Sequence, residues 1–488
     1  MVIESLKYKI LQQFGFAPTQ EQGQALDTFV SFLTDRDPQA VMILRGSAGT
    51  GKTSLSGAIV RTLLQIRQKV MLLAPTGRAA KVFSLGSGAP AYTIHRRIYR
   101  EKAFAGVDGQ FSLNDNLYTD TLFMVDEASM IANMGLGGTT FGSGCLLDDL
   151  VKFVYQGHND RLLLIGDKAQ LPPVGEEESP ALSASVMEGY GLKVYECDLN
   201  EVLRQSQSSG ILYNATLIRQ MITHDAVTGL PLIRFKGFAD IVMMPGAELV
   251  ESLGDSYHHV GMDETMVITR SNKRANIYNN GIRNMVLDRE EELSSGDMLM
   301  IVKNNYFWTE KEKKESEEGS AGAVPAFLAN GDRAKVLRVS NYIELYGFRF
   351  ATLLLQLPDY DDYEMQVTGM LDTLQSEAPA LTHEQQEELF RQVEEDYQHF
   401  VPLKADRMKS IRQDAYFNAL QIKYAYAVTC HKAQGGQWAH VYVDQGYMTD
   451  DMLAPDYIHW LYTAFTRATD KLFLVNWPKE QTCEPADL

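Results

Sequence analysis

A ten-residue segment near the N-terminus places the strongest constraint on how this chain can fold. Residues 45–54 read RGSAGTGKTS and contain the complete phosphate-binding pattern from Gly46 to Thr53. Four apolar residues, 41–44, precede the segment, and a stretch compatible with a helix follows it. A strand must deliver such a loop and a helix must leave it, because backbone N–H groups and the helix N-terminus then converge on phosphate oxygens. The sequence therefore predicts an α/β domain that binds a nucleotide.

The residue types in this phosphate-binding loop fit that chemistry. Glycines let the backbone curl with positive φ and approach a ligand closely. Lys52 is expected to reach the β- and γ-phosphates, and the Thr53 hydroxyl is expected to hold Mg²⁺. The predicted nucleotide-binding residues of the loop are Gly46, Ser47, Ala48, Gly49, Thr50, Gly51, Lys52, Thr53 and Ser54.

A second apolar run, 122–125, ends in two carboxylates, Asp126 and Glu127. The carboxyl end of a parallel strand lies at the edge where such sheets bind ligands. We expect Asp126 to hold Mg²⁺, and Glu127 to orient and deprotonate the attacking water. Considered alone, the segment also fits a solvated loop after a core strand. Beside the phosphate-binding loop, the catalytic interpretation is favoured.

Charge and composition limit which partners this chain can bind and which class of protein it can be. The chain has 488 residues, a hydrophobic content of 45% and a net charge of −18. That charge, taken over the whole chain, argues against nucleic-acid binding, because phosphate contacts need Lys and Arg. A basic channel can still occupy a small part of an acidic surface. No apolar run approaches about 20 residues and the four cysteines are scattered, so we expect a cytoplasmic protein without membrane span or zinc site.

Apolar runs that are typical of buried strands recur along the chain with helical stretches between them. They cover residues 41–44, 70–73, 122–125, 162–165, 266–268, 441–443 and 472–475. Continuous apolar strands that alternate with helices indicate parallel sheets covered on both faces. The length suggests about three domains at roughly 150 residues each. The runs fall into two groups, before about residue 180 and after about residue 200, which predicts two α/β units.

Three stretches interrupt this rhythm. Residues 96–120 are polar with two glycines and predict a small hairpin insertion, while residues 133–144 are glycine-rich and are expected to be mobile. Residues 296–405 predict a small β-barrel with a helical appendage, the helix covering 383–400. Five apolar residues would share one face of that helix: Leu389, Phe390, Val393, Tyr397 and Phe400.

Further polar residues follow the later strands. Gln170, just beyond the run 162–165, could sense a γ-phosphate through a hydrogen bond, although a strand ended by prolines is the simpler reading. Arg204 and Arg467 could stabilise transition-state charge, but each taken alone fits a surface ion pair better. Thr429 and His431 lie in a polar cluster that fits either a grip on a phosphate backbone or a satisfied turn.

Together these segments form a recognisable series. In chain order they read PTQEQ, GSAGTGKT, APTGRAA, TIH, DEAS, GDKAQLPPVG, EVLRQ, TRSN, TCHKAQGGQW and LYTAFTRA. The series covers nearly the whole chain and resembles the superfamily 1B DNA helicases of the RecD-like and Dda-like branch. Ten short motifs in the order of the family are far more specific than any single motif.

The resemblance implies an ATP-dependent 5′–3′ DNA helicase or translocase in repair or recombination, using ATP and Mg²⁺. By resemblance, Gln22 recognises adenine, and Gln170, Arg204 and Arg467 close on the γ-phosphate. Gln437 stands where many relatives carry Glu, which weakens the expected contact to the ribose. The residues that resemble contacts to single-stranded DNA are Thr76, Thr93, His95, Thr429 and His431.

The same resemblance implies the organisation of the chain. Two RecA-like motor domains would cover 1–95 with 121–195, and 196–295 with 406–488. A strand-separating hairpin would occupy 96–120, and an SH3-like barrel with a helical appendage would occupy 296–405. The expected partners are single-stranded and tailed duplex DNA, bound by a monomer as the minimal motor, with room for protein partners. An RNA helicase of a neighbouring branch and a non-catalytic scaffold subunit are the alternatives.

Overall fold

The structure is a computed structural model. It describes residues 2–101, 111–135, 142–202, 208–223, 229–315, 324–325, 327–401, 403–449 and 452–483. The chain divides into two compact units: unit 1 comprises residues 1–104, 108–246 and 433–488, and unit 2 comprises 105–107 and 247–432. Residues 433–488 thus group with the phosphate-binding loop. The motor-domain boundaries implied by the resemblance remain a proposal.

Unit 1 is built on a six-stranded parallel sheet with the order β3-β2-β6-β7-β1-β8. Its strands are β1 Ala40–Gly46, β2 Lys69–Ala74, β3 Ala91–Thr93, β6 Thr121–Val125, β7 Arg161–Gly166 and β8 Lys193–Leu199. Every residue of β1, β6 and β7 is buried, as continuous apolar runs predict for strands covered on both faces. The α/β prediction is confirmed.

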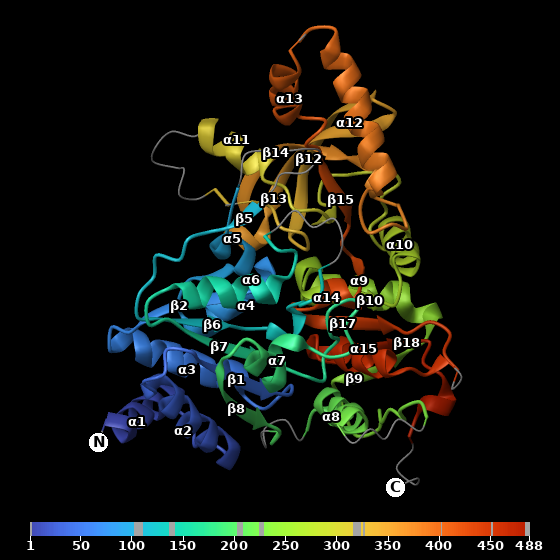
Figure 1. The fold of residues 1–488 in the computed structure, drawn as a ribbon. Coiled ribbons are helices and arrows are strands. Elements are labelled where there is room, and N and C mark those ends of the chain that lie inside the picture. Colours follow the sequence, from blue (N-terminus) through green and yellow to red (C-terminus); the bar gives the residue numbers. More distant parts are fainter. Residues whose placement is uncertain are drawn as a thin grey trace. The chain divides into compact units, whose positions relative to one another are not determined.

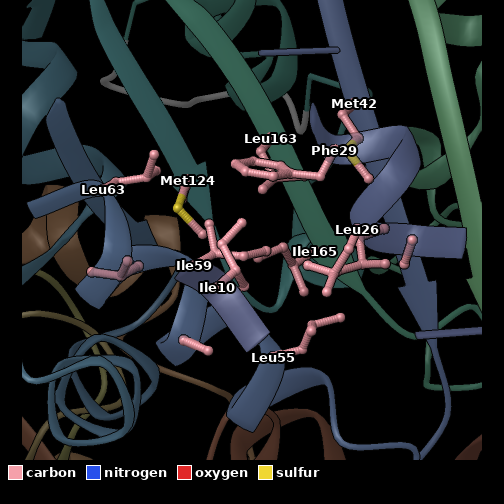
Figure 2. Packing of buried hydrophobic residues seen from close by; sticks show 14 of the residues in the cluster. Ile10, Leu26, Phe29, Met42, Leu55, Ile59, Leu63, Met124, Leu163 and Ile165 are labelled. Atoms are coloured by element: carbon pink, nitrogen blue, oxygen red, sulfur yellow. The ribbon is translucent and has the colours of Figure 1, made fainter. Parts of the chain in front are cut away.

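Helices cover both faces of this sheet (Figure 1). One face packs against α1 Val2–Phe14, α2 Gln20–Thr34 and α3 Lys52–Gln65. Figure 2 shows this core, in which Ile10, Phe29 and Ile59 meet side chains from the strands. The opposite face packs against α6 Leu146–Gln156. The remaining helices of the unit are α4 Gly77–Ser87, α5 Ile94–Ile98, α7 Ala184–Gly189, α8 Gly210–Thr223 and α15 Pro455–Phe465.

Two smaller groups of strands complete unit 1. The parallel strands β17 Trp438–Asp444, β18 Ala468–Val475 and β9 Ile241–Met244 pair in that order. In the segment expected to form a hairpin, β4 Tyr99–Glu101 pairs antiparallel with β5 Phe111–Leu113. Residues 102–110, which include the expected tip, and residues 136–141 of the glycine-rich stretch lie outside the described part of the chain.

Unit 2 contains the predicted β-barrel, which is confirmed as a closed barrel of five strands. The strands are β11 Met298–Ile301, β12 Arg333–Leu345, β13 Phe348–Leu357, β14 Tyr363–Met370 and β15 Leu420–Tyr424. The strand that closes the barrel, β15, lies beyond residue 405 and pairs with both β11 and β14. The segment 296–405 is therefore not sufficient to form the barrel.

The helical appendage consists of α12 His383–Gln398 and α13 Lys404–Arg412, which lie side by side beyond the barrel (Figure 1). Leu389 and Val393 are buried on the predicted face of α12, and Phe390 and Tyr397 pack against the same cluster. Phe400 does not belong to this face. It lies beyond the last helical residue and is 77% exposed, because the helical periodicity no longer applies there.

Unit 2 also contains two short parallel strands, β10 Thr265–Thr269 and β16 Ala427–Thr429, against which α10 Asn272–Gly281 packs. Its other helices are α9 Leu249–His259, α11 Phe307–Glu315 and α14 Cys430–Ala433. Across the described residues of both units, no helix combines the length and the apolar character needed to span a membrane.

Candidate nucleotide-binding and catalytic site

The phosphate-binding loop connects the end of β1 to the start of α3, as predicted. Gly49 and Gly51 have φ values of 77° and 80°, in the left-handed region that favours glycine. A Cβ on Gly46 would lie 2.8 Å from Cγ of Lys52, so this position also requires glycine. The Lys52 ammonium donates hydrogen bonds to the carbonyls of Gly46 and Ser47, the latter at 3.0 Å. The loop is therefore folded around its own lysine.

Gln22 supports this loop from α2. Its amide nitrogen donates to the Thr50 carbonyl at 2.9 Å, and its amide oxygen accepts from the Thr19 backbone N–H at 3.0 Å. Thr19 is the N-cap of the helix, so the two residues form a capping box. Gln22 is 1% exposed, and both ends of its amide are engaged with the protein. The expected contact to adenine stays a prediction, while the structure adds a role in bracing the loop.

Asp126 and Glu127 follow β6 at the carboxyl edge of the sheet. The Glu127 backbone N–H donates to Oδ1 of Asp126 at 2.9 Å. Burial and then the charge of Glu127 raise the pKa of Asp126 above its usual value, while nearby Lys52 acts in the opposite direction. Glu127 has a φ of 52°, a backbone conformation that is uncommon outside glycine. Such conformations persist only where the surrounding structure fixes them.

Gln170 joins two other predicted catalytic residues. With its amide oriented so that both ends are satisfied, it donates to Oε2 of Glu127 at 3.2 Å and accepts from Nη2 of Arg467 at 3.0 Å. Gln170 is 6% exposed and Arg467 is 2% exposed. Three residues predicted from separate motifs thus form one hydrogen-bonded row, in which Gln170 and Arg467 are buried and Glu127 is half-buried. Arg204, another predicted catalytic residue, lies outside the described residues.

Arg467 is fixed from several sides. Its Nε donates to the Thr463 carbonyl at 3.1 Å, and its Nη1 donates to the Gly436 carbonyl at 3.2 Å. The backbone around Gly436 is also close to α4, because Arg78 donates to the Gln437 carbonyl and stacks on the Trp438 ring with its guanidinium 4.6 Å from the centroid. The Gln437 side chain is exposed, and its expected contact to ribose stays a prediction.

Two residues near the loop were not predicted from the sequence. Arg219 on α8 donates to the Ser47 hydroxyl and, at 3.4 Å, to the Asn200 carbonyl. Tyr462 on α15 accepts a hydrogen bond from the Ala48 backbone N–H at 3.0 Å. Tyr462 lies in the LYTAFTRA motif five residues before Arg467, so its place in that motif was the available signal. No comparable sequence signal marks Arg219.

In unit 1, the predicted nucleic-acid residues lie at the carboxyl ends of neighbouring strands. β2 pairs with β3 so that Ala74 is opposite Thr93. Thr76 caps α4 by accepting from the Ala79 N–H at 3.2 Å, and Thr93 caps α5 by accepting from the Arg96 N–H at 3.4 Å. Burial lowers the pKa of His95 to about 4, so its imidazole is neutral at pH 7.

Unit 2 contains a similar strand edge. Thr269 at the end of β10 pairs with Thr429 at the end of β16. His431 follows in α14, and the neighbouring Lys432 donates to Oδ1 of Asn330. Burial, followed by the charge of Lys423, lowers the pKa of Lys432 to about 8. Each unit thus gathers polar residues where two parallel strands end.

Two protein-family models match parts of this chain. Residues 17–229 match the family model of an AAA domain, and residues 424–475 match that of a UvrD-like helicase C-terminal domain. The first match contains the phosphate-binding loop and Gln170, and the second contains Thr429 and Arg467. Both matches are consistent with the resemblance to the superfamily 1B helicases.

Individual helicases resemble parts of the chain. It is 30% identical over 157 residues to the ATP-dependent RecD2 DNA helicase of Deinococcus radiodurans, a match that covers 32% of this chain and 18% of that protein. It is 25% identical over 267 residues to the ATP-dependent DNA helicase dda of Enterobacteria phage T4, covering 53% and 55%. Both matches thus span less than two thirds of the relative.

Among solved structures, the chain is similar to the Pif1 helicase from Bacteroides in complex with ADP-AlF3 and ssDNA. The TM-score is 0.46 and the sequence identity is 13%, over 96% of this chain and 95% of that chain.

Proposed function

We propose that this chain is an ATP-dependent DNA helicase or translocase that moves 5′ to 3′ along single-stranded DNA in repair or recombination. The observation that carries the proposal is the hydrogen-bonded row in which Gln170 joins Glu127 to Arg467. A carboxylate that can activate water and an arginine that can neutralise a γ-phosphate are thereby linked through one amide. Such a link suits a motor, because movement of one group is transmitted to the other.

Each residue has a distinct part in this proposal. Lys52 and the loop amides bind the β- and γ-phosphates. Glu127 accepts a proton from the attacking water, and Arg467 stabilises the charge that develops on the γ-phosphoryl oxygens. Arg204 would supply a second positive charge from the EVLRQ motif. Because Glu127 and Arg467 share Gln170, hydrolysis would depend on the placement of α15.

The residues present fit a magnesium ion. Asp126 lies at the sheet edge beside Glu127, and its raised pKa indicates a carboxylate whose charge is poorly compensated there. A divalent cation would compensate it. Asp126 and the Thr53 hydroxyl would hold Mg²⁺, which would neutralise charge on the transferring phosphoryl oxygens.

Nucleic acid would be held at the two strand edges described above. Thr76, Thr93 and His95 would contact one part of a single strand, and Thr429 and His431 would contact another. Because His95 is neutral at pH 7, it can offer a hydrogen bond but little charge. The hairpin 96–120 would act as the wedge that separates base pairs. Gln22 and Gln437 would contact the adenine and the ribose, as the resemblance implies.

ATP turnover with Mg²⁺, measured with and without single-stranded DNA, tests the proposal. We expect stimulation by DNA and little stimulation by RNA of the same sequence, with Lys52→Ala as the inactive control. Strand displacement should occur on duplexes with a 5′ single-stranded tail and hardly at all on 3′-tailed or blunt duplexes. Lack of stimulation by either nucleic acid would contradict the motor, and preference for the 3′ tail would contradict the direction.

A further inference from the structure

A buried tyrosine hydroxyl joins the phosphate-binding loop to the segment that carries Gln170. The Tyr462 hydroxyl accepts from the Ala48 N–H at 3.0 Å and donates to Oδ2 of Asp167 at 2.6 Å. Tyr462 is 1% exposed, and burial raises its pKa well above its usual value. The phenol therefore stays neutral and can accept and donate at the same time.

Asp167 connects this hydroxyl to the catalytic row. Its side chain is 4% exposed, and its second oxygen, Oδ1, accepts from the Ala169 N–H at 3.0 Å. The Asp167 carbonyl accepts from the Gln170 N–H at 3.3 Å. The carboxylate that receives the phenol thus begins the turn that ends at Gln170. A shift of this turn would move the amide that links Glu127 to Arg467.

Two residues of α15 near Tyr462 also hold this helix against the Asp167–Gln170 turn. The Leu171 N–H donates to the Thr463 hydroxyl at 2.8 Å, and Nδ1 of His459 lies 2.9 Å from the Ala169 carbonyl. These two contacts reach the turn, whereas Tyr462 also reaches the phosphate-binding loop. The Tyr462 hydroxyl therefore links the chain segment that carries Arg467 to the phosphate-binding loop.

We propose that Tyr462 is a positioning residue for ATP hydrolysis. Its hydroxyl holds the loop at Ala48 in register with the Asp167–Gln170 turn and with α15, so that Glu127, Gln170 and Arg467 act on the γ-phosphate together. This inference rests on the proposed ATPase function. Loss of the hydroxyl should affect turnover more than nucleotide binding, because the Lys52 ammonium and the other loop amides remain in place.

The decisive variant is Tyr462→Phe, which keeps the buried ring and removes both hydrogen bonds. We expect kcat to fall between about 10-fold and about 100-fold, because small misplacements of catalytic groups have effects of this size. KM for ATP should change less than about threefold. The matched control is Tyr457→Phe, a buried tyrosine on the same helix whose hydroxyl donates to Gln445. That variant should keep the wild-type kcat.

A double-mutant cycle separates positioning from a general loss of stability. If Tyr462 acts through Gln170, adding Tyr462→Phe to Gln170→Ala should lower kcat by less than about threefold further, because residues that act as one unit are not additive. Two independent losses that multiply would overturn the inference. Thermal unfolding of each variant shows whether it is folded at the assay temperature.

Asp167→Asn decides the question if Tyr462→Phe does not fold. An amide has one acceptor oxygen, whereas the carboxylate accepts from both the Tyr462 hydroxyl and the Ala169 N–H. One of these bonds must be lost, so kcat should fall with little change in KM. Unchanged kcat in whichever of the two variants is folded, beside an active wild type, would overturn the inference alone. A wild type without ATPase activity would overturn the proposed function and this inference together.

Discussion

The predicted catalytic residues and the predicted nucleic-acid residues of unit 1 are held in different ways. Gln170 takes its partners, Glu127 and Arg467, from segments that are far away in the sequence. Thr76 and Thr93 instead accept from backbone N–H groups three residues further along the chain. The catalytic row therefore depends on tertiary packing, whereas the threonines are fixed by local helix caps. Substitutions should affect turnover at the first site and local helix stability at the second.

Removing the arginine from the row should have the largest effect. Arg467→Ala should lower kcat by about 10³-fold, because a positive charge beside the γ-phosphoryl group is lost in the transition state. Nucleotide affinity, measured with a fluorescent ATP analogue, should change much less. Arg219→Lys is the comparison variant. It alters a positively charged side chain near the phosphate-binding loop that does not belong to the row of Glu127, Gln170 and Arg467. Normal turnover of Arg467→Ala would remove this arginine from the catalytic site.

Glu127→Gln should lower kcat by about 10²-fold or more, because the amide cannot take the proton from water. The amide keeps its size and can still hydrogen-bond to Gln170, so the row should stay assembled. Binding of Mg·ATP should therefore be retained, as measured by equilibrium titration. Near-wild-type hydrolysis by this variant would show that another group serves as the base.

The strand edge of unit 2 should respond differently. His431→Ala should leave basal ATP hydrolysis unchanged within about twofold and weaken its stimulation by single-stranded DNA. The concentration of DNA that gives half-maximal stimulation is the quantity to measure, since loss of a contact raises it. An equal loss of basal and stimulated rates would argue against contact with nucleic acid at this edge.

A conservative pair of variants separates the capping role of Thr93 from its predicted contact with DNA. Thr93→Ala should lower the free energy of unfolding by about 1 kcal/mol, the usual contribution of an N-cap hydroxyl. Thr93→Ser keeps the capping oxygen and should restore most of that loss. If Thr93→Ser also restores DNA-stimulated turnover, the hydroxyl is sufficient for both roles. Full DNA stimulation in Thr93→Ala would show that Thr93 acts only as a cap.

His95 should make the stability of the folded protein depend on pH. Its pKa in the folded protein is about 4, below the usual value near 6.5 for an unfolded chain. Between these two pH values, the unfolded state therefore binds more protons than the folded state. The free energy of unfolding falls as pH is lowered from about 6.5 toward 4, because protonation of His95 then favours the unfolded chain. Thermal unfolding of His95→Gln should show a shallower slope in this window than the wild type. Equal slopes would mean that His95 does not titrate in this way.

Local sequence patterns predicted the central strands and failed at the margins. Residues 41–44, 122–125 and 162–165 form strands buried on both faces, where an apolar run is required. β8 was missed because it lies at the edge of the sheet, and its polar residues in KVYECDL are compatible with exposure. β3 and β16 have three residues each, too few to give a periodic signal.

The candidate site shows the same division. The sequence by itself determined the phosphate-binding loop, because its glycines, Lys52 and flanking elements are consecutive and their geometry is local. It also marked Glu127, Gln170 and Arg467, but only as separate candidates. The tertiary structure decided that they form one row and that Tyr462 joins the loop to it. Hydrogen bonds between distant segments arise only when the sheet and α15 have packed, so no local pattern specifies them.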